Sequence, residues 1–298
     1  MTRGIFVGLA TLDLVYNVDD FPAPNAKVAA RDQQVYAGGP ATNAAIAFAH
    51  LGGDATLVAA VGCHPLAQLI RDELRRYSVQ LIDLYPGFDD LPAVSSVTVD
   101  RAGRRNVVSA NAARMVAPLA QIDPALCAQA DVVLVDGHQM PACQAWAAAA
   151  RQRGVPVVFD GGSWKAGTDA LLTLVHTAIC SEDFHPPGCA GNEEILRDLA
   201  SRGVAKIAIS HGAGAMDALS DGIASPVAVP QVSVVDTMGA GDILHGAYCY
   251  YAAAGLGFVD ALSAAAKVAS YSCCFAGTRA WMENGEPSWR ITMKKTED

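Results

Sequence analysis

The sequence predicts an α/β fold: a three-layer, doubly wound and mostly parallel sheet with a small β-sheet lid beside it. Three observations point to this class. Apolar runs of strand length alternate with segments of helix length, the runs are apolar throughout, and two stretches break this rhythm with short alternating patterns. Continuously apolar strands are typical of parallel sheets that helices cover on both faces.

The elements of the main sheet follow one another along nearly the whole chain. The predicted strands are 4–9, 55–61, 130–137, 155–161, 205–210 and 232–235. The predicted helices are 40–53, 65–77, 141–153, 192–202, 240–255 and 258–275, and a loop is expected over 275–287. The first helix begins with proline and ends at Gly52-Gly53, as helix termini favour. We expect one domain over residues 1–298.

The two irregular stretches, 14–36 and 91–110, predict the small sheet. Apolar and polar residues alternate over 96–99, and Ala102-Gly103 suits a hairpin turn. An ordinary surface loop and hairpin is the alternative. Because both stretches adjoin candidate ligand segments, we expect them to form a lid.

Composition narrows the class of protein. Of the 298 residues, 52% are apolar and 17% are charged, which suits a large buried core. The net charge of −9 argues against nucleic acid as a main partner, although a helix N-terminus can still bind a small phosphate. The sequence offers neither a membrane-spanning stretch nor a secretory pattern at its start, so we expect a cytoplasmic protein. Its eight cysteines form no CxxC pair and read as reduced, mostly buried thiols.

The stretch VVDTMGAGDILHGAY, residues 234–248, carries the main chemical signal. Asp236 or Thr237 can cap the helix that follows. The turn Gly239-Ala240-Gly241 then lets backbone amides approach an anion at the helix N-terminus. A carboxylate at Asp242 would repel a phosphate, so it makes sense as the group that orients and deprotonates an attacking hydroxyl. The alternative is a plain glycine turn in which Asp242 caps the helix or is solvated.

Two common phosphate-binding motifs are missing from the sequence. A Walker-type loop needs GxxxxGK[ST], which does not occur. A dinucleotide GxGxxG motif should follow the first strand, but FVGLATLD has a single glycine.

The DTMGAGD run resembles the C-terminal signature of the ribokinase (PfkB) family of carbohydrate kinases. A second stretch, AGGPATNAAIAFAHLGG at 37–53, is similar to the N-terminal signature of that family. The resemblance covers nearly the whole chain. It implies phosphoryl transfer from ATP to a sugar hydroxyl with Mg²⁺, a doubly wound α/β domain with a small β-sheet lid, and a homodimer formed through the lid.

The resemblance also implies roles for individual residues. The catalytic set is Asp242 as base with Gly239, Ala240 and Gly241 as the anion hole. The substrate-binding set is Asp13, Gly38, Gly39 and Asn43. The nucleotide-binding set is Ser210, Gly212 and Gly277.

One motif departs from the family pattern. Many relatives carry N-x-x-E after a strand, and the Glu helps to arrange magnesium. Here the corresponding stretch is CSEDFHPPG, with Ser181 in place of Asn and Phe184 in place of Glu. A similar loss in ketohexokinase-like and sulfofructose-kinase-like members favours a ketose-type substrate. No metal ligand is assigned, and magnesium is expected to be held chiefly by the nucleotide phosphates.

Three further charged residues have two readings each. Asp160 ends a strand and can either approach the nucleotide or cap the next turn. Arg104 and Arg105 in the lid hairpin can meet an anionic substituent of a substrate or remain exposed charges.

The leading functional hypothesis is ATP-dependent phosphorylation of a small sugar or sugar derivative. The alternatives are a nucleoside kinase of the adenosine type and a sugar- or nucleotide-binding regulator without activity.

Overall fold

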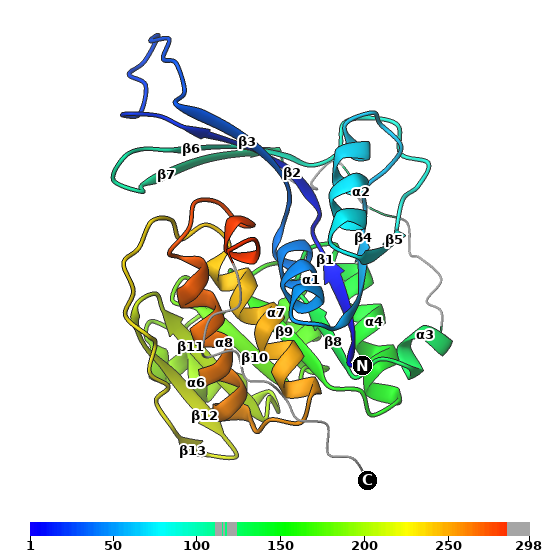
Figure 1. The fold of residues 1–298 in the computed structure, drawn as a ribbon. Helices are drawn as coiled ribbons and strands as arrows, with labels where there is room; N and C mark the ends of the chain where they lie inside the picture. Colours follow the sequence, from blue (N-terminus) through cyan, green and yellow to red (C-terminus); the bar gives the residue numbers. More distant parts are fainter. Residues whose placement is uncertain (111–114, 116, 118–123, 285–298) are drawn as a thin grey trace.

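A computed structural model describes residues 1–110, 115, 117 and 124–284, and a nine-stranded sheet forms its centre (Figure 1). In spatial order the strands are β13 (Ile223–Ala224), β12 (Gly214–Ser220), β11 (Lys206–His211), β10 (Thr177–Ser181), β9 (Val157–Gly161), β8 (Val132–Val135), β1 (Arg3–Gly8), β4 (Asp54–Ala59) and β5 (Val79–Asp83). All neighbours from β11 to β5 are parallel, whereas β12 and β13 are antiparallel. The predicted mostly parallel sheet is confirmed.

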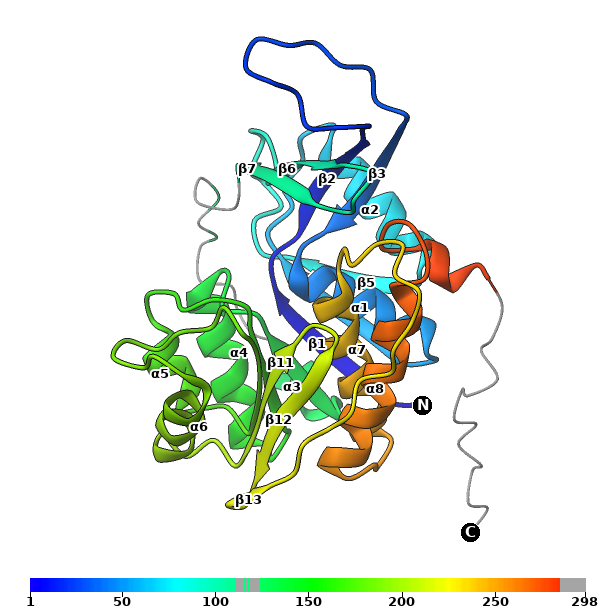
Figure 2. The same cartoon turned by 90° about the vertical axis from the view of Figure 1, so that its left-hand side faces the viewer.

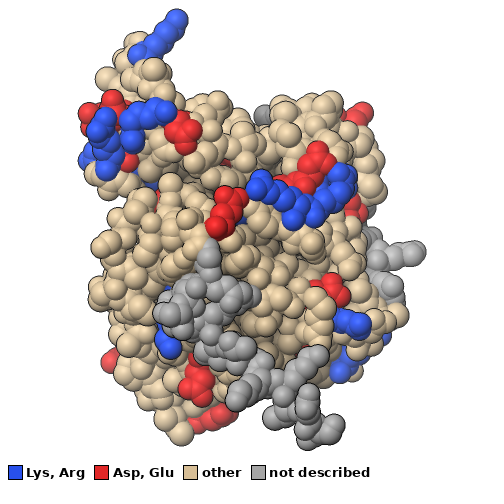
Figure 3. Space-filling view, in the orientation of Figure 1, with Lys and Arg blue, Asp and Glu red and all other residues tan. Residues whose placement is uncertain are grey.

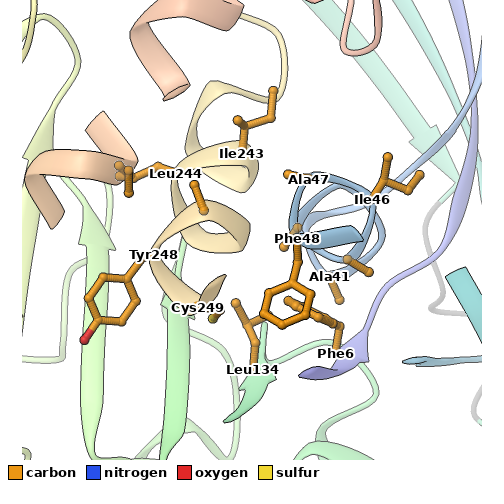
Figure 4. Packing of buried hydrophobic residues seen from close by; sticks show 14 of the residues in the cluster. Phe6, Ala41, Ile46, Ala47, Phe48, Leu134, Ile243, Leu244, Tyr248 and Cys249 are labelled. Atoms are coloured by element: carbon orange, nitrogen blue, oxygen red, sulfur yellow. The ribbon is translucent and has the colours of Figure 1, made fainter. Parts of the chain in front are cut away.

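Helices pack on both faces of this sheet (Figure 2). One core contains residues of α1 (Pro40–His50), α2 (Ala67–Arg76), α7 (Ala240–Ala253) and α8 (Phe258–Ser272). The other contains residues of α3 (Pro124–Ala128), α4 (Met140–Gln152), α5 (Thr168–Leu172) and α6 (Asn192–Ser201). Strand β1 serves both cores, because successive side chains of a strand point to opposite faces. Phe6 packs against Phe48 in the first core (Figure 4), and Ile5 and Val7 lie in the second.

Strand β1 marks the point where the order of the sheet reverses. It lies between β4 and β8, so the chain builds one half of the sheet towards β5 and later the other half towards β11. In open α/β sheets, ligands bind outside the carboxyl ends of the strands at this point. The ends of β1 and β8 therefore locate the candidate site.

A smaller sheet extends from the carboxyl end of β1 and stands above that edge of the large sheet (Figures 1 and 2). Its strands in order are β3 (Asp32–Gly38), β2 (Thr11–Asn17), β6 (Val94–Val99) and β7 (Arg105–Ala110). Strand β2 pairs antiparallel with β3 and parallel with β6. The separate small sheet that the stretches 14–36 and 91–110 predicted is thus present.

The predicted strand at 232–235 is wrong. The backbone N–H groups of Val235 and Asp236 donate instead to the carbonyl of Cys273, which follows α8, at 2.8 and 3.2 Å. The side chains of Val234 and Val235 are exposed. The apolar letters therefore belong to an irregular segment that crosses the end of α8.

Several shorter elements were not predicted. They are β5, β10, β12, β13, α3 and α5, together with a 3₁₀ turn η1 (Ala280–Met282) inside the predicted loop 275–287. Residues 285–287 of that loop lie outside the described residues. Within the described part of the chain, no helix is long and apolar enough to cross a membrane. The eight cysteines are all unpaired thiols, and five of them are buried.

Candidate active site

The start of helix α7 leaves two backbone donors free. Gly239 precedes the helix with φ of 69°, and a Cβ there would lie 2.8 Å from the Thr278 side chain, so this position requires glycine. Among the described residues, the N–H groups of Gly241 and Asp242 have no acceptor, while that of Ala240 donates to the preceding turn. Free N–H groups at the positive end of a helix are a typical anion-binding arrangement.

The expected side-chain cap of α7 is not formed, and this corrects the prediction for Asp236 and Thr237. The carboxylate of Asp236 instead accepts hydrogen bonds from the N–H groups of Met238 and Gly277, both at 2.9 Å. Asp236 therefore holds the glycine turn against the loop that follows α8. The helix N–H groups remain available to a ligand because no side chain occupies them.

Asp242 and Asn43 meet across two helices. Nδ2 of Asn43 on α1 donates to Oδ2 of Asp242 on α7 over 2.7 Å. Their helices approach closely because a Cβ at Gly246, one turn after Asp242, would lie only 2.2 Å from the carbonyl oxygen of Ala44. Figure 4 shows α1 and α7 side by side over the core. The small residues at this crossing thus set the contact between the amide and the carboxylate.

Asp13, Gly38 and Gly39 form the neighbouring wall, where the small sheet joins the large one. The half-buried carboxylate of Asp13 accepts a hydrogen bond from the Thr11 hydroxyl at 2.5 Å. A Cβ at Gly38 would lie 1.8 Å from Oδ2 of Asp13. Gly39 has φ of 100°, and a Cβ there would lie 2.3 Å from the carbonyl oxygen of Leu9. The positive φ and the backbone contact require glycine at position 39, whereas a side chain at position 38 would displace the Asp13 carboxylate.

A buried carboxylate that the sequence reading missed supports this wall. Asp136, at the end of β8, accepts hydrogen bonds from the N–H groups of Leu9 at 2.9 Å and Ala41 at 3.2 Å. It therefore joins the end of β1 to the first turn of α1. Its position directly after the apolar run VVLV was the available signal.

A second missed residue, Arg279, fixes the orientation of Asn43. Its Nη1 donates to Oδ1 of Asn43 at 2.9 Å, its Nη2 to the carbonyl of Ala37 at 2.6 Å, and its Nε to Oε1 of Glu73 at 2.8 Å. An arginine can only donate, so the oxygen of the Asn43 amide must face Arg279 and its NH₂ group must face Asp242. Arg279, which is 5% exposed, thus links strand β3 of the small sheet to the candidate base.

Burial and two neighbouring carboxylates raise the pKa of Asp242. Burial and the nearby charge of Asp160 raise it to about 7, and Asp13 adds to this effect. The hydrogen bond from Asn43 and the charge of His245 act in the opposite direction. Asp242 is therefore a carboxyl group that titrates close to neutral pH.

Asp160 does not cap a turn. It is 5% exposed, its Oδ2 has no hydrogen-bond partner among the described residues, and this oxygen lies 3.5 Å from Nδ1 of His245. Burial raises the pKa of Asp160. The structure places Asp160 beside His245 and not among the residues that line the cavity at the start of α7, so its approach to the nucleotide stays a prediction.

A cavity of about 230 Å³ opens at the start of α7. Its walls come from the end of β11, the segment before α7 and the last turns of α8, and they are mainly apolar. The residues include Ser210, Gly212, Met216, Val229, Val232, Thr237, Ala240, Gly241, Leu244, Ala266, Ala269 and Cys273. The predicted nucleotide residues Ser210 and Gly212 thus share one cavity with Ala240 and Gly241. Gly277 is not among the lining residues and instead packs against Tyr36 of the small sheet, where a Cβ would lie 2.4 Å from the tyrosine oxygen.

The model of the pfkB family of carbohydrate kinases matches residues 1–284. The chain belongs to this family. It is an ATP-dependent carbohydrate kinase, and the family resemblance drawn from the two sequence signatures is confirmed.

Relatives and solved structures agree with the family. Mouse (Mus musculus) ribokinase is 24% identical over 264 residues, which are 84% of this chain and 81% of that protein. The bifunctional ribokinase/ribose-5-phosphate isomerase A of Fructilactobacillus sanfranciscensis is 26% identical over 258 residues, which are 83% of this chain. The match spans only about half (48%) of that longer relative. The crystal structure of a candidate ribokinase from Agrobacterium tumefaciens has a TM-score of 0.84 and 26% identity, with 93% of this chain and 92% of that chain covered.

In this pfkB kinase Phe184 stands at the place where many relatives carry the acid that helps to arrange magnesium. Phe184 is fully buried against Phe159 and Trp164, and the hydroxyl of Ser181 donates to the carbonyl of Gly162 at 3.1 Å. In the described ranges, no group of three or more His, Cys, Asp or Glu side chains is placed to hold a metal ion. These residues do not fit a protein-held magnesium at this position.

The arginines of the lid hairpin mostly pair within the small sheet. Figure 3 shows Lys and Arg side chains gathered at its outer end. Arg104 pairs with Asp100 at 2.6 Å, and Arg31 and Arg101 both pair with Asp19. Arg105 lies exposed on β7. For Arg104 the structure therefore supports the reading as a hairpin charge rather than a substrate contact.

Proposed function

We propose that this kinase transfers the γ-phosphoryl group of ATP directly to a hydroxyl of a small sugar, a ketose or ketose derivative, with Asp242 as the base. One observation carries the proposal. The carboxylate of Asp242 is oriented by Asn43 at 2.7 Å and stands beside the two free N–H groups at the start of α7. A base and an anion-binding site at one point are what phosphoryl transfer to an alcohol requires.

Asp242 then acts on the attacking hydroxyl. Its Oδ2 is engaged by Asn43, and no hydrogen bond within the described chain reaches its Oδ1, which is free to accept the proton of an alcohol. A pKa of about 7 suits a general base that works near neutral pH. The N–H groups of Gly241 and Asp242 stabilise the charge on the transferring phosphoryl group, with Gly239 and Ala240 shaping the turn.

The sugar lies between Asp242 and the small sheet in this mechanism. Asp13 and Asn43 bind its hydroxyl groups, and Gly38 and Gly39 let it lie against the backbone. The small sheet, which the stretches 14–36 and 91–110 form, acts as a lid over the sugar. Its closure excludes water as a competing acceptor of the phosphoryl group.

ATP occupies the apolar cavity beside α7, with Ser210 and Gly212 at its phosphates or ribose. Gly277 stays a predicted nucleotide contact on the loop that follows α8. Magnesium arrives on the nucleotide phosphates, because the chain provides no cluster of acids for it in its described part.

An acceptor panel tests the function. With ATP and Mg²⁺, we expect ADP formation with one or a few pentoses, hexoses or ketoses, measured by a coupled assay. Turnover with nucleosides alone would replace the sugar proposal by the nucleoside-kinase alternative. Binding of a sugar by calorimetry without turnover across the panel would favour the inactive regulator.

We also infer that two copies of the chain pair through the small sheet. Strand β7 is an edge strand that is exposed along its length, and Val108 on it is 75% exposed. An exposed apolar edge strand is a ready partner for a second copy. Light scattering should give the mass of a dimer for the protein and of a monomer for Val108→Asp. Val259→Asp, a change at an exposed valine on α8, should remain dimeric, and a monomeric wild-type protein would contradict the inference.

A further inference from the structure

Helix α7 carries a second ionisable side chain one turn after Asp242. His245 is only 6% exposed. Its Nδ1 lies 2.6 Å from the carbonyl oxygen of Gly241, and its Nε2 lies 2.9 Å from the carbonyl oxygen of Ile179 in β10. Both ring nitrogens therefore face hydrogen-bond acceptors.

These two contacts determine the protonation state of the ring. A neutral imidazole has one N–H donor and one acceptor nitrogen. A neutral His245 would direct a nitrogen lone pair at a carbonyl oxygen in either tautomer. Only the imidazolium donates to both carbonyls, and the carboxylate of Asp160, 3.5 Å from Nδ1, adds a partner for its charge.

The electrostatic surroundings agree with a charged ring. Burial acts to lower the pKa of His245, but Asp160, the carbonyls of Ile179 and Gly241, and Asp242 outweigh it, so that this pKa is raised. The charged groups that act on the His245–Asp160 pair are Asp242 on α7, Asp136 after β8, His138 before α4 and Lys165 after β9. The buried thiols of Cys180 on β10 and Cys249 on α7 also lie within the electrostatic reach of Asp160.

The Gly241 carbonyl connects His245 to the anion-binding N–H groups at the start of α7. It belongs to the same peptide group as the N–H of Asp242, one of the two free donors. A charged donor on the oxygen of a peptide polarises the group and strengthens its N–H as a donor. The bond to Ile179 at the same time fastens the first turn of α7 to the large sheet.

We propose that His245 is a permanently protonated positioning residue, which fixes and polarises the Gly241–Asp242 peptide of the anion site and favours the ionised form of the Asp242 carboxylate. This inference rests on the proposed function of that site.

The protonation state can be measured without knowing the sugar. In a ¹⁵N-labelled imidazole spectrum of the whole protein at pH 7 to 8, both nitrogens of His245 should carry protons. His176 is the internal control, because its Nδ1 accepts the N–H of Val157 and must be unprotonated there. An unprotonated nitrogen on His245 at pH 7 would overturn the proposal, whatever the acceptor panel shows.

Two variants test the positioning role. His245→Asn keeps one donor and removes the charge, so we expect kcat to fall about tenfold or more with little change in the sugar KM. The acid limb of kcat/KM should move to higher pH, since Asp242 loses a nearby cation. Asp160→Asn should move that limb to lower pH, since Asp242 loses a nearby anion.

Shifts of the acid limb in opposite directions in the two variants support the proposal. A merely structural role of His245 and Asp160 would not make the direction of the shift depend on the sign of the charge that is removed. Limbs that coincide with that of the wild-type protein in both variants would refute it. If His245→Asn does not fold, the spectrum of the unmodified protein and the profile of Asp160→Asn still decide. If no acceptor supports ADP formation but both nitrogens of His245 carry protons, the proposed function is refuted. The assignment of a positive charge to His245 would then still hold.

Discussion

Asp242→Asn should reduce kcat by about 10² to 10⁴ while ATP binding, measured by calorimetry, stays close to that of the unchanged protein. The amide cannot accept the proton of the attacking hydroxyl. It can still accept the hydrogen bond from Nδ2 of Asn43, so the local geometry is kept. The free N–H groups of α7 are also unchanged.

The stability of this variant gives a second readout with a defined sign. The pKa of Asp242 is raised to about 7 in the folded protein, above its value in the unfolded chain. The group therefore lowers stability progressively as the pH rises from about 4, and this cost is complete above about pH 7. Asp242→Asn should therefore raise Tm at pH 8, and the difference should vanish as the pH falls towards 4. Greater stability together with lost turnover separates a catalytic role from a structural one.

A matched control is available on the next helix. Asp260 lies exposed in the first turn of α8, where it has the same place relative to its helix as Asp242. Asp260→Asn should leave kcat unchanged. Near-normal turnover of Asp242→Asn would contradict the role of Asp242 as base.

Arg279→Ala should lower the free energy of unfolding by about 3–5 kcal/mol, because it removes the charged partner of Glu73 from a largely buried pair and leaves that carboxylate only the N–H of Ala37. Arg279→Lys should lower it less. Both variants should reduce kcat/KM at least about tenfold, since the Asn43 amide loses the contact that sets its orientation towards Asp242. Urea unfolding and steady-state kinetics measure the two effects.

The neighbouring pair of Arg76 and Glu283 provides the control for this prediction. Their side chains are well exposed, and exposed pairs contribute about 0–1 kcal/mol. Arg76→Ala should thus have nearly the stability and activity of the unchanged protein. Equal urea midpoints of unfolding for Arg76→Ala and Arg279→Ala would show that the buried contacts of Arg279 do not stabilise the fold as described.

Patterns local to the chain predicted much of the fold. The continuously apolar runs at 4–9, 55–61 and 155–161 are strands of the parallel sheet, because burial on both faces leaves a signature in the sequence itself. The glycine turn before Asp242 likewise predicted the start of a helix with accessible backbone amides. The run at 232–235 was wrongly predicted as a strand. Its apolar residues do not reveal that the N–H groups of Val235 and Asp236 donate to the carbonyl of Cys273 rather than to a neighbouring strand.

The rest of the candidate site could not be predicted, because it depends on contacts between distant segments. Asn43 and Arg279 are 236 positions apart, and Glu73 and Arg279 are 206 apart. No local spacing indicates that a lone arginine after α8 orients an amide on α1. The ring of His245 reads from sequence as an ordinary helix residue, and only its burial between two carbonyls reveals its charge.

The missing cap of α7 also has a consequence for the lifetime of the enzyme. Under the proposed function, a nucleotide phosphate supplies the partner that the first amides of this helix lack, so ATP should stabilise the fold as well as take part in the reaction. Without ATP, we therefore expect a larger share of molecules to open at this end of the helix, where a protease can cleave them.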